Sequence, residues 1–288
     1  MLIQDFLGYI SKEKRYSDHT LIGYRRDLLD FEFFCQNEFG FELLEAKPKI
    51  IRSWFATLME KELTPRTIRR KSSSLKSFYK FLLKNRDIKQ SPMEGVPLPK
   101  VSKQLPKFVE EKNMDTLLSE LSFSDNYDGV MEKLVIEMFY HTGMRLSELI
   151  GLKISNINFS ENQLKVLGKR NKERIIPFSF ALTETIRQFL TYRKSKSDIL
   201  FVLENGKAAY NKLIYRVVNK HLNKVTTIKQ KSPHVLRHTF ATHMLNNGAE
   251  LNAIKELLGH VNLSATEVYT HNSLEKIKSI YKQAHPRA

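Results

Sequence analysis

Apolar residues in the first third of the chain recur at helical spacing. Between residues 17 and 38 they fall every three or four positions, as one face of a helix requires. They are Leu21, Tyr24, Leu28, Phe31 and Cys35. Residues 50–62 and 64–86 also favour helices, and Thr64 followed by Pro65 is typical of a helix start. The first hundred residues therefore predict an all-helical domain.

The pattern changes at a proline-rich stretch near residue 100. Four prolines fall between residues 91 and 106 among basic and polar residues with little periodicity, which indicates a linker. A chain of 288 residues is long enough for two domains, each with its own core. We expect residues 1–99 to form the helical domain, residues 100–106 the linker and residues 107–288 a second domain.

The second domain predicts helices around a small sheet. Residues 130–152 favour a helix, whereas residues 157–177 favour extended chain. Within the extended stretch Leu164 and Val166 alternate with polar neighbours, and residues 168–172 favour a turn, which predicts a hairpin with a basic tip. Helices follow to the C-terminus. The expected fold is mainly α with a small antiparallel β-sheet, in which a helical domain precedes an α+β domain.

The charge of the chain narrows the choice of partner. Lys and Arg number 47 against 31 acidic residues, a net charge of +16, which favours a polyanionic partner, although a merely soluble basic protein would also fit. The first ten residues do not read as a signal peptide, and no apolar run approaches the roughly 18 residues that span a bilayer, so we expect no membrane partner. The single cysteine, Cys35, excludes an intramolecular disulfide and favours a reducing cytoplasm.

The predicted helix over residues 64–86 carries a cluster of basic residues beside a run of three serines. The basic residues are Arg66, Arg69, Arg70, Lys71 and Lys76. Such a surface suits phosphates and base edges in a DNA groove. An ordinary solvated helix face has the same composition, so the sequence leaves both interpretations open.

Four short polar motifs follow the linker. They are Thr142-Gly143-Met144-Arg145-Leu146-Ser147-Glu148-Leu149, Gly168-Lys169, His234-Val235-Leu236-Arg237-His238, and Leu257-Leu258-Gly259-His260 with Tyr269 nine residues later. Each alone is typical of structural residues, because a lone arginine is usually a surface charge and a lone tyrosine usually packs. Together, their order and spacing resemble the catalytic set of the tyrosine recombinases, in particular the short Xer-type enzymes of bacteria, over nearly the whole chain.

The resemblance implies a fold and a set of catalytic residues. The implied fold is a SAM-like helical core-binding domain followed by a catalytic domain. The implied catalytic residues are Arg145, Lys169, His234, Arg237, His260 and the nucleophile Tyr269. The hairpin turn of the family usually reads Gly-Lys-Gly, whereas here it reads Gly168-Lys169-Arg170, so Lys172 remains an alternative to Lys169.

Phosphodiester cleavage calls for the same residue types. Attack by a phenol oxygen builds negative charge on the phosphate, which the guanidinium groups of Arg145 and Arg237 can meet with paired donors. The phenol proton must leave during attack, so His234 is the candidate base, and Lys169 is the candidate acid for the leaving 5′ oxygen. His260 would bond the phosphate or orient the nucleophile. Because the phosphotyrosine conserves the bond, we expect neither a metal nor a nucleotide cofactor.

The resemblance also implies partners and a location. It implies strand exchange on double-stranded DNA at a specific core site, through a 3′-phosphotyrosine and a Holliday junction. The active assembly would be a homotetramer on two DNA sites, in the bacterial cytoplasm at the nucleoid. A heterotetramer with a second recombinase and a need for a DNA translocase stay open. So does the choice among resolution of chromosome or plasmid dimers in chromosome partition at cell division, mobile-element integration, and inversion.

The C-terminal segment presents an apolar helical face whose partner the sequence does not fix. Ile277, Ile280, Tyr281 and Ala284 share that face. It would either dock on a neighbouring subunit or pack on its own domain.

Other function classes fit parts of the pattern. A metallohydrolase would use His234 and His238, which are four apart, but the His-Glu-x-x-His motif is missing and Arg237 would place a cation beside the metal. A type IB topoisomerase uses similar chemistry but relaxes supercoils instead of exchanging strands. A non-catalytic DNA-binding protein would not need all six polar positions filled.

Overall fold

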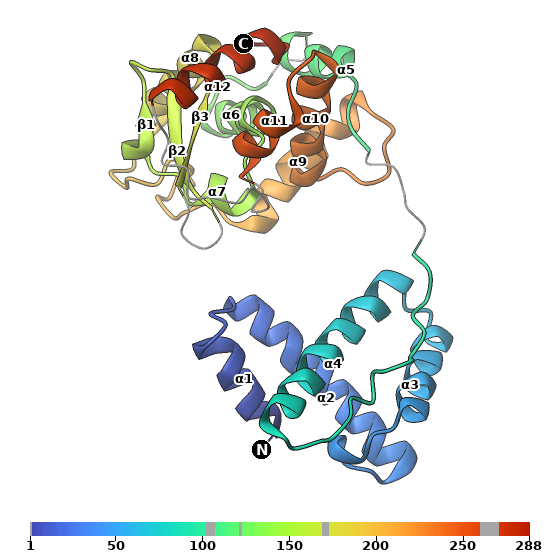
Figure 1. Ribbon diagram of the computed structural model, residues 1–288. Helices are drawn as coiled ribbons and strands as arrows, with labels where there is room; N and C mark the ends of the chain where they lie inside the picture. The colour runs from blue at the N-terminus through green and yellow to red at the C-terminus, as the bar shows by residue number, and fades with distance from the viewer. Residues whose placement is uncertain (1, 102–106, 121–122, 169–172, 260–270) are drawn as a thin grey trace. The chain divides into compact units, whose positions relative to one another are not determined.

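The computed structural model describes residues 2–101, 107–120, 123–168, 173–259 and 271–288. The chain divides into two compact units, Met1–Gln104 and Leu105–Ala288, which we call the N-terminal and C-terminal units (Figure 1). Most of the expected linker, residues 102–106, lies outside the described residues. Within the described ranges, no helix is both long and apolar enough to cross a bilayer.

The N-terminal unit is all-helical, as its apolar spacing predicts. Its elements are α1 (Leu2–Lys12), α2 (Asp18–Phe39), the short 3-10 helix η1 (Leu43–Glu45), α3 (Pro48–Glu60) and α4 (Pro65–Asn85). The predicted start of α4 is confirmed, because the Thr64 side chain accepts a hydrogen bond from the Thr67 backbone N–H and Pro65 follows it. Aromatic side chains fill the core, with Phe31 against Trp54 and Phe6 against Phe78.

The C-terminal unit contains helices around a small sheet. Its described elements are α5 (Glu111–Asp115), the short π-helix η2 (Thr116–Glu120), α6 (Tyr127–Thr142), α7 (Leu146–Ile150), the 3-10 helix η3 (Ile154–Asn156), β1 (Ile157–Asn158), β2 (Gln163–Leu167), β3 (Glu173–Pro177), α8 (Phe180–Tyr192), α9 (Asn211–Val225), α10 (Pro233–Asn246), α11 (Leu251–Leu258) and α12 (His271–Ala284). Helix α6 packs against α8, α9 and α10, and its residues 134–142 are all buried. The predicted fold class is therefore confirmed.

The strands of the C-terminal unit form the predicted antiparallel hairpin. Within the described residues the strand order is β1-β2-β3, and Val166 of β2 lies opposite Arg174 of β3. Leu164, Val166 and Ile176 face the core, since each is almost fully buried. The alternation places Arg174 on that same face, where it is only 4% exposed. The hairpin tip, residues 169–172, lies outside the described residues.

The structure corrects the prediction of one continuous helix over residues 130–152. Helix α6 ends at Thr142, Gly143 adopts a left-handed conformation with φ of +57°, and α7 begins at Leu146. A helix cannot continue through a residue in that conformation. The helical period of the sequence alone therefore missed a break in front of Arg145.

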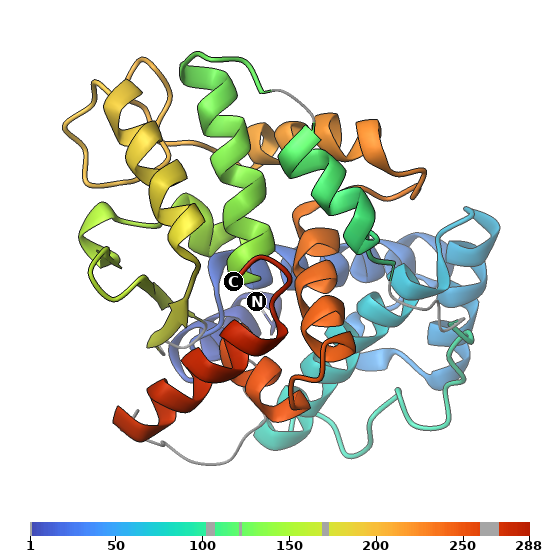
Figure 2. The same cartoon turned by 90° about the horizontal axis from the view of Figure 1, so that it is seen from above.

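The C-terminal helix α12 packs on its own unit. It contacts α10, α11 and β3 (Figure 2), and Ile277, Tyr281 and Ala284 are buried in the core. Polar contacts hold the segment after it. The Nε2 atom of His285 donates to the Tyr140 carbonyl over 3.1 Å, and its Nδ1 accepts from the Arg287 backbone N–H. Of the two alternatives for this face, the single chain adopts the one within its own unit.

The buried His285 predicts a loss of stability at mildly acidic pH. Burial lowers the pKa of His285 to about 4, only partly offset by its bond to the Tyr140 carbonyl. Because the folded pKa lies below the unfolded one near 6.5, the unfolded chain binds more protons, and stability falls as the pH drops from about 6.5 to about 4. The loss should reach on the order of 3 kcal/mol.

The variant His285→Gln tests this link, because it keeps a side-chain N–H donor but does not titrate. Calorimetric melting temperatures of the C-terminal unit should fall less steeply between pH 6.5 and 4.5 in this variant than in the unmodified chain. His19→Gln serves as the control for the substitution itself, because His19 lies in the N-terminal unit and not in the unit whose melting is measured. Equal slopes in His285→Gln and the unmodified chain would contradict the prediction.

Candidate active site

The break between α6 and α7 depends on a glycine with no room for a side chain. A Cβ atom on Gly143 would lie 2.5 Å from Cδ1 of Phe240 in α10 and 2.8 Å from Cδ2 of Leu258 in α11. Glycine therefore meets two requirements there, a positive φ and close packing. The turn that it permits places Arg145 directly before α7.

Arg145 is fixed by a carboxylate and by a backbone carbonyl. Its Nη1 donates to Oε1 of Glu148 over 2.7 Å, and its backbone N–H donates to Oε2 of the same residue over 2.7 Å. Its Nη2 donates to the Gly259 carbonyl over 2.9 Å. The side chain nevertheless stays 23% exposed. Arg145 is thus held in one orientation and still accessible to a ligand.

Arg237 reaches the same place from α10. Its Nη1 donates to the Gly143 carbonyl over 2.6 Å, and its Nη2 donates to the Leu258 carbonyl over 2.7 Å. Burial, together with the charges of Arg145 and Arg174, lowers the pKa of Arg237 to about 10. The guanidinium therefore remains charged at neutral pH.

A third arginine, Arg174 of β3, joins the cluster, and sequence reasoning missed it. Its Nη1 and Nη2 donate to the two carboxylate oxygens of Glu148 over 2.9 and 2.8 Å. Burial alone would raise the pKa of Glu148, but the bonds and charge of Arg174 and the bonds of Arg145 lower it to about 2. The signal in the sequence was the alternation of β3, which puts Arg174 on the core face and so requires a buried acceptor.

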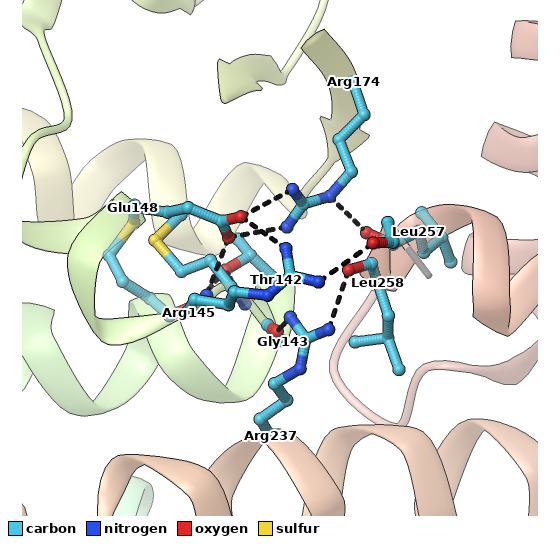
Figure 3. Close-up of polar contacts among 11 residues, drawn as sticks. Thr142, Gly143, Arg145, Glu148, Arg174, Arg237, Leu257 and Leu258 are labelled. Carbon is cyan, nitrogen blue, oxygen red and sulfur yellow. Dashed lines mark hydrogen bonds and ion pairs between the residues drawn. The ribbon is translucent and has the colours of Figure 1, made fainter. Parts of the chain in front are cut away.

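All three arginines donate hydrogen bonds to carbonyls at the C-terminal end of α11 (Figure 3). Arg174 Nε donates to Leu257 over 2.7 Å, so Arg174, Arg237 and Arg145 hold the successive carbonyls of Leu257, Leu258 and Gly259. The C-terminal carbonyls of a helix lack partners within the helix and carry partial negative charge. Among the described residues, three cations here face one carboxylate, Glu148, and this excess of positive charge suits a phosphate.

The other expected catalytic residues are placed only in part. His234 lies in the first turn of α10, one turn before Arg237, and is exposed. Leu236 and Phe240 point into the core, as predicted. The expected residues Lys169, His260 and Tyr269 lie outside the described residues, as does the alternative Lys172. The geometry therefore brings together the two expected arginines.

The basic residues of α4 do not all face outward. Arg66, Arg69, Arg70 and Lys76 are exposed, and Arg70 also pairs with the buried carboxylate of Asp27. Contrary to the expectation that all five basic residues line one surface, the structure buries Lys71. Its side chain is 6% exposed and forms ion pairs with Asp27 and Asp30. Since a buried ammonium requires such partners, Lys71 holds α4 against α2.

Family models match both units of the chain. Residues 107–276 match the model described as "Phage integrase family", and residues 3–86 match "Phage integrase, N-terminal SAM-like domain". The chain belongs to the phage integrase family. The resemblance expected from the four motifs is confirmed.

Curated members of this family resemble the chain over almost its full length. The chain is 37% identical to the tyrosine recombinase XerC of Bacillus subtilis (strain 168), covering 98% of this chain and 95% of that relative. It is 34% identical to the tyrosine recombinase XerC of Chlorobaculum tepidum, covering 99% of this chain and 94% of that relative. The Xer-like character of this phage integrase family member is confirmed.

Solved structures of the family share the fold. The Tn1549 transposon integrase in complex with transposon right end DNA is 22% identical, with a TM-score of 0.74 over 96% of this chain and 97% of that chain. The XerH recombinase bound to palindromic difH substrate is 20% identical, with a TM-score of 0.70 over 99% of this chain and 82% of that chain. At these identities the likeness is one of fold.

The packing around Gly143 predicts a large effect of a single methyl group in this family member. Gly143→Ala should destabilise the C-terminal unit, because its Cβ would overlap Phe240 and its φ is positive. Gly248→Ala is the matched control, since Gly248 also has a positive φ but no atom within 4 Å of the added Cβ. Calorimetry should show that Gly143→Ala costs more than the control by about 1–3 kcal/mol. Equal costs would mean that the site relaxes around the methyl group.

Proposed function

We propose that this chain is a site-specific DNA recombinase that cleaves and rejoins duplex DNA through a 3′-phosphotyrosine formed by Tyr269. The observation that carries the proposal is the convergence of Arg145 and Arg237 from separate elements onto adjacent carbonyls at the end of α11. Two oriented guanidiniums at one point suit a phosphate on which charge develops.

The fixed orientation of these arginines is what makes them suited to catalysis. Each guanidinium uses some of its donors on the protein itself, Arg145 on Glu148 and Gly259, and Arg237 on Gly143 and Leu258. Because the groups are already in place, they need little reorganisation when the phosphate oxygens gain charge. We propose that the N–H donors which these contacts leave unused bond the non-bridging oxygens, with the partly exposed Arg145 as the first contact.

The remaining steps are proposed for residues that the motifs supply. The phenol oxygen of Tyr269 attacks phosphorus while His234 takes its proton, and the bond to the 5′ oxygen breaks as Lys169 protonates that oxygen. Lys172 is the alternative donor, and His260 bonds the phosphate or orients the nucleophile. Rejoining is the same sequence in reverse, with a 5′ hydroxyl as the nucleophile, and it needs neither a metal nor a nucleotide.

The proposed partner is double-stranded DNA with a specific core site. The exposed side chains of Arg66, Arg69, Arg70 and Lys76 in α4 would contact it, and the solved relatives described above are complexes with DNA. We propose a homotetramer on two sites, at the nucleoid in the cytoplasm, that exchanges strands through a Holliday junction. The XerC relatives favour resolution of chromosome or plasmid dimers over integration or inversion. A second recombinase and a translocase are further candidates for partners.

The nucleophile is tested by removing one oxygen atom. Tyr269→Phe should bind its DNA site with unchanged affinity but form no covalent complex, because only the phenol oxygen is lost. The measurement is a denaturing gel of protein with a nicked suicide substrate, beside a native gel shift. A denaturant-resistant adduct in the variant would show that another residue attacks. Relaxation of unrelated supercoiled plasmid by the unmodified chain would instead indicate a topoisomerase.

Transition-state stabilisation can be separated from DNA binding with arginine variants. Arg145→Lys and Arg237→Lys keep the charge but lose the paired donors, so single-turnover cleavage at saturating protein should slow by on the order of a hundredfold. Their affinity for DNA should hardly change. Arg69→Ala is the converse control, which should weaken binding and leave the cleavage rate of bound complexes intact. Cleavage at the unmodified rate by both lysine variants would reduce these arginines to phosphate anchors.

A further inference from the structure

Arg174 is the member of the arginine cluster to which neither the motifs nor the chemistry above gives a role. Its side chain is only 4% exposed, and Nε, Nη1 and Nη2 each donate to Leu257 or Glu148. Arg145 beside it is 23% exposed. Arg174 is therefore poorly placed to touch DNA, and an influence on the reaction would have to pass through its neighbours.

The neighbour that Arg174 controls is Glu148. The two terminal nitrogens of Arg174 donate to the two carboxylate oxygens of Glu148, and this bidentate contact fixes the plane of the carboxylate. Arg145 donates to the same carboxylate, from Nη1 to Oε1 and from its backbone N–H to Oε2. The orientation of Arg145 thus depends on a carboxylate whose own orientation depends on Arg174.

Arg174 also determines how much positive charge Arg145 presents. Arg145 alone with Glu148 would form a neutral ion pair, 2.7 Å apart, whose attraction for a phosphate largely cancels. Arg174 contributes a second cation to the same carboxylate, 2.8 Å away, so the group of three keeps a positive charge. The carboxylate can then orient Arg145 without neutralising it.

Arg174 also binds the end of α11 beside Arg145 and Arg237. Its Nε donates to the Leu257 carbonyl, and the next two carbonyls along the chain accept from Arg237 and Arg145. Gly259 leaves space for it, since a Cβ there would lie 3.1 Å from Cδ of Arg174. Strand β3 is thereby joined to the end of α11 at the point where the catalytic arginines meet.

We propose that Arg174 is a positioning residue for strand cleavage, which orients and offsets Glu148 so that Arg145 meets the phosphate as an oriented cation. This inference rests on the proposed recombinase function. It assigns to Arg174 an effect on the rate of cleavage through Arg145 and no contact with DNA.

The test is single-turnover cleavage of a suicide substrate at saturating protein. Arg174→Lys keeps the charge but loses the fork on Glu148, so we expect cleavage slower by about 10- to 100-fold, the loss that is typical when a residue orienting a metal ligand is changed. DNA affinity by gel shift should stay within about twofold, because Arg174 does not reach the duplex. Cleavage by Arg174→Lys at the unmodified rate would overturn the proposal.

Introducing Arg174→Lys into the Arg145→Lys variant distinguishes a positioning role of Arg174 from a general structural role. In Arg145→Lys the group that Arg174 orients is already altered, so adding Arg174→Lys should slow cleavage by less than about threefold more, since residues acting as one unit are not additive. The same fold loss in both backgrounds would show that Arg174 acts independently of Arg145 and would overturn the proposal.

Arg193 provides the matched control for losing a carbonyl-binding arginine. Its guanidinium donates to the carbonyls of Ser195, Ser197 and Ile199, and none of these residues belongs to the candidate site. Arg193→Lys should lower the melting temperature and leave the cleavage rate unchanged well below it. If Arg193→Lys slowed cleavage as much as Arg174→Lys, the effect would be one of stability and the proposal would fail.

A neutral pair covers the case in which Arg174→Lys does not fold. Arg174→Met combined with Glu148→Gln removes both partners of the buried Arg174–Glu148 ion pair, so neither is left as a lone charge and the variant should fold. It should still cleave slowly, because Arg145 loses its oriented carboxylate acceptor. Cleavage at the unmodified rate by this pair would overturn the inference about Arg174. Failure of the unmodified chain to form any covalent complex would instead refute the recombinase function itself.

Discussion

The C-terminal unit depends on how buried arginines are satisfied at the end of α11. Arg145, Arg174 and Arg237 come from the break after α6, from β3 and from α10, and they bind three successive carbonyls. Arg145 and Arg174 also share the carboxylate of Glu148. Burying a guanidinium is costly unless its N–H donors are hydrogen-bonded. Here the carboxylate and the carbonyls accept those hydrogen bonds and so compensate the cost. Helix end, strand and helix break are therefore fixed together.

Much of the architecture followed from periodicity, because helices and strands bury their apolar faces in different patterns. Helices α2, α3 and α4, the hairpin and the two motif arginines were all predicted, whereas α1 was not. The break at Gly143 was not, since a left-handed residue and its close contact with Phe240 leave no mark on the helical period. Arg174 was missed because its partner Glu148 is 26 residues away in the chain.

The burial of Lys71 was missed for the same reason, since its partners are also distant in the chain. A basic residue has the same chemistry whether it faces a phosphate or an aspartate, and only its partner tells the two apart. Asp27 is fully buried and bonds Arg70 and Ser74 as well as pairing with Lys71, so part of the positive charge of α4 serves the packing of the N-terminal unit. Net charge alone therefore overstates how much of this helix is available to an external ligand.

The pairing of Val166 with Arg174 links the length of the hairpin to the chemistry beside α11. Because side chains alternate along a strand, a shift of β3 by one residue would turn Arg174 to the solvent face and bring Glu173 or Ile175 against Glu148. Substitutions that keep β3 in this register therefore preserve the cluster, whereas a one-residue slip of β3 would remove Arg174 from it. A shift of two residues would keep the alternation but would move Arg174 about 7 Å along the strand, away from Glu148 and Leu257. The position of Arg174 therefore constrains the register of β3 and not only the face that it presents.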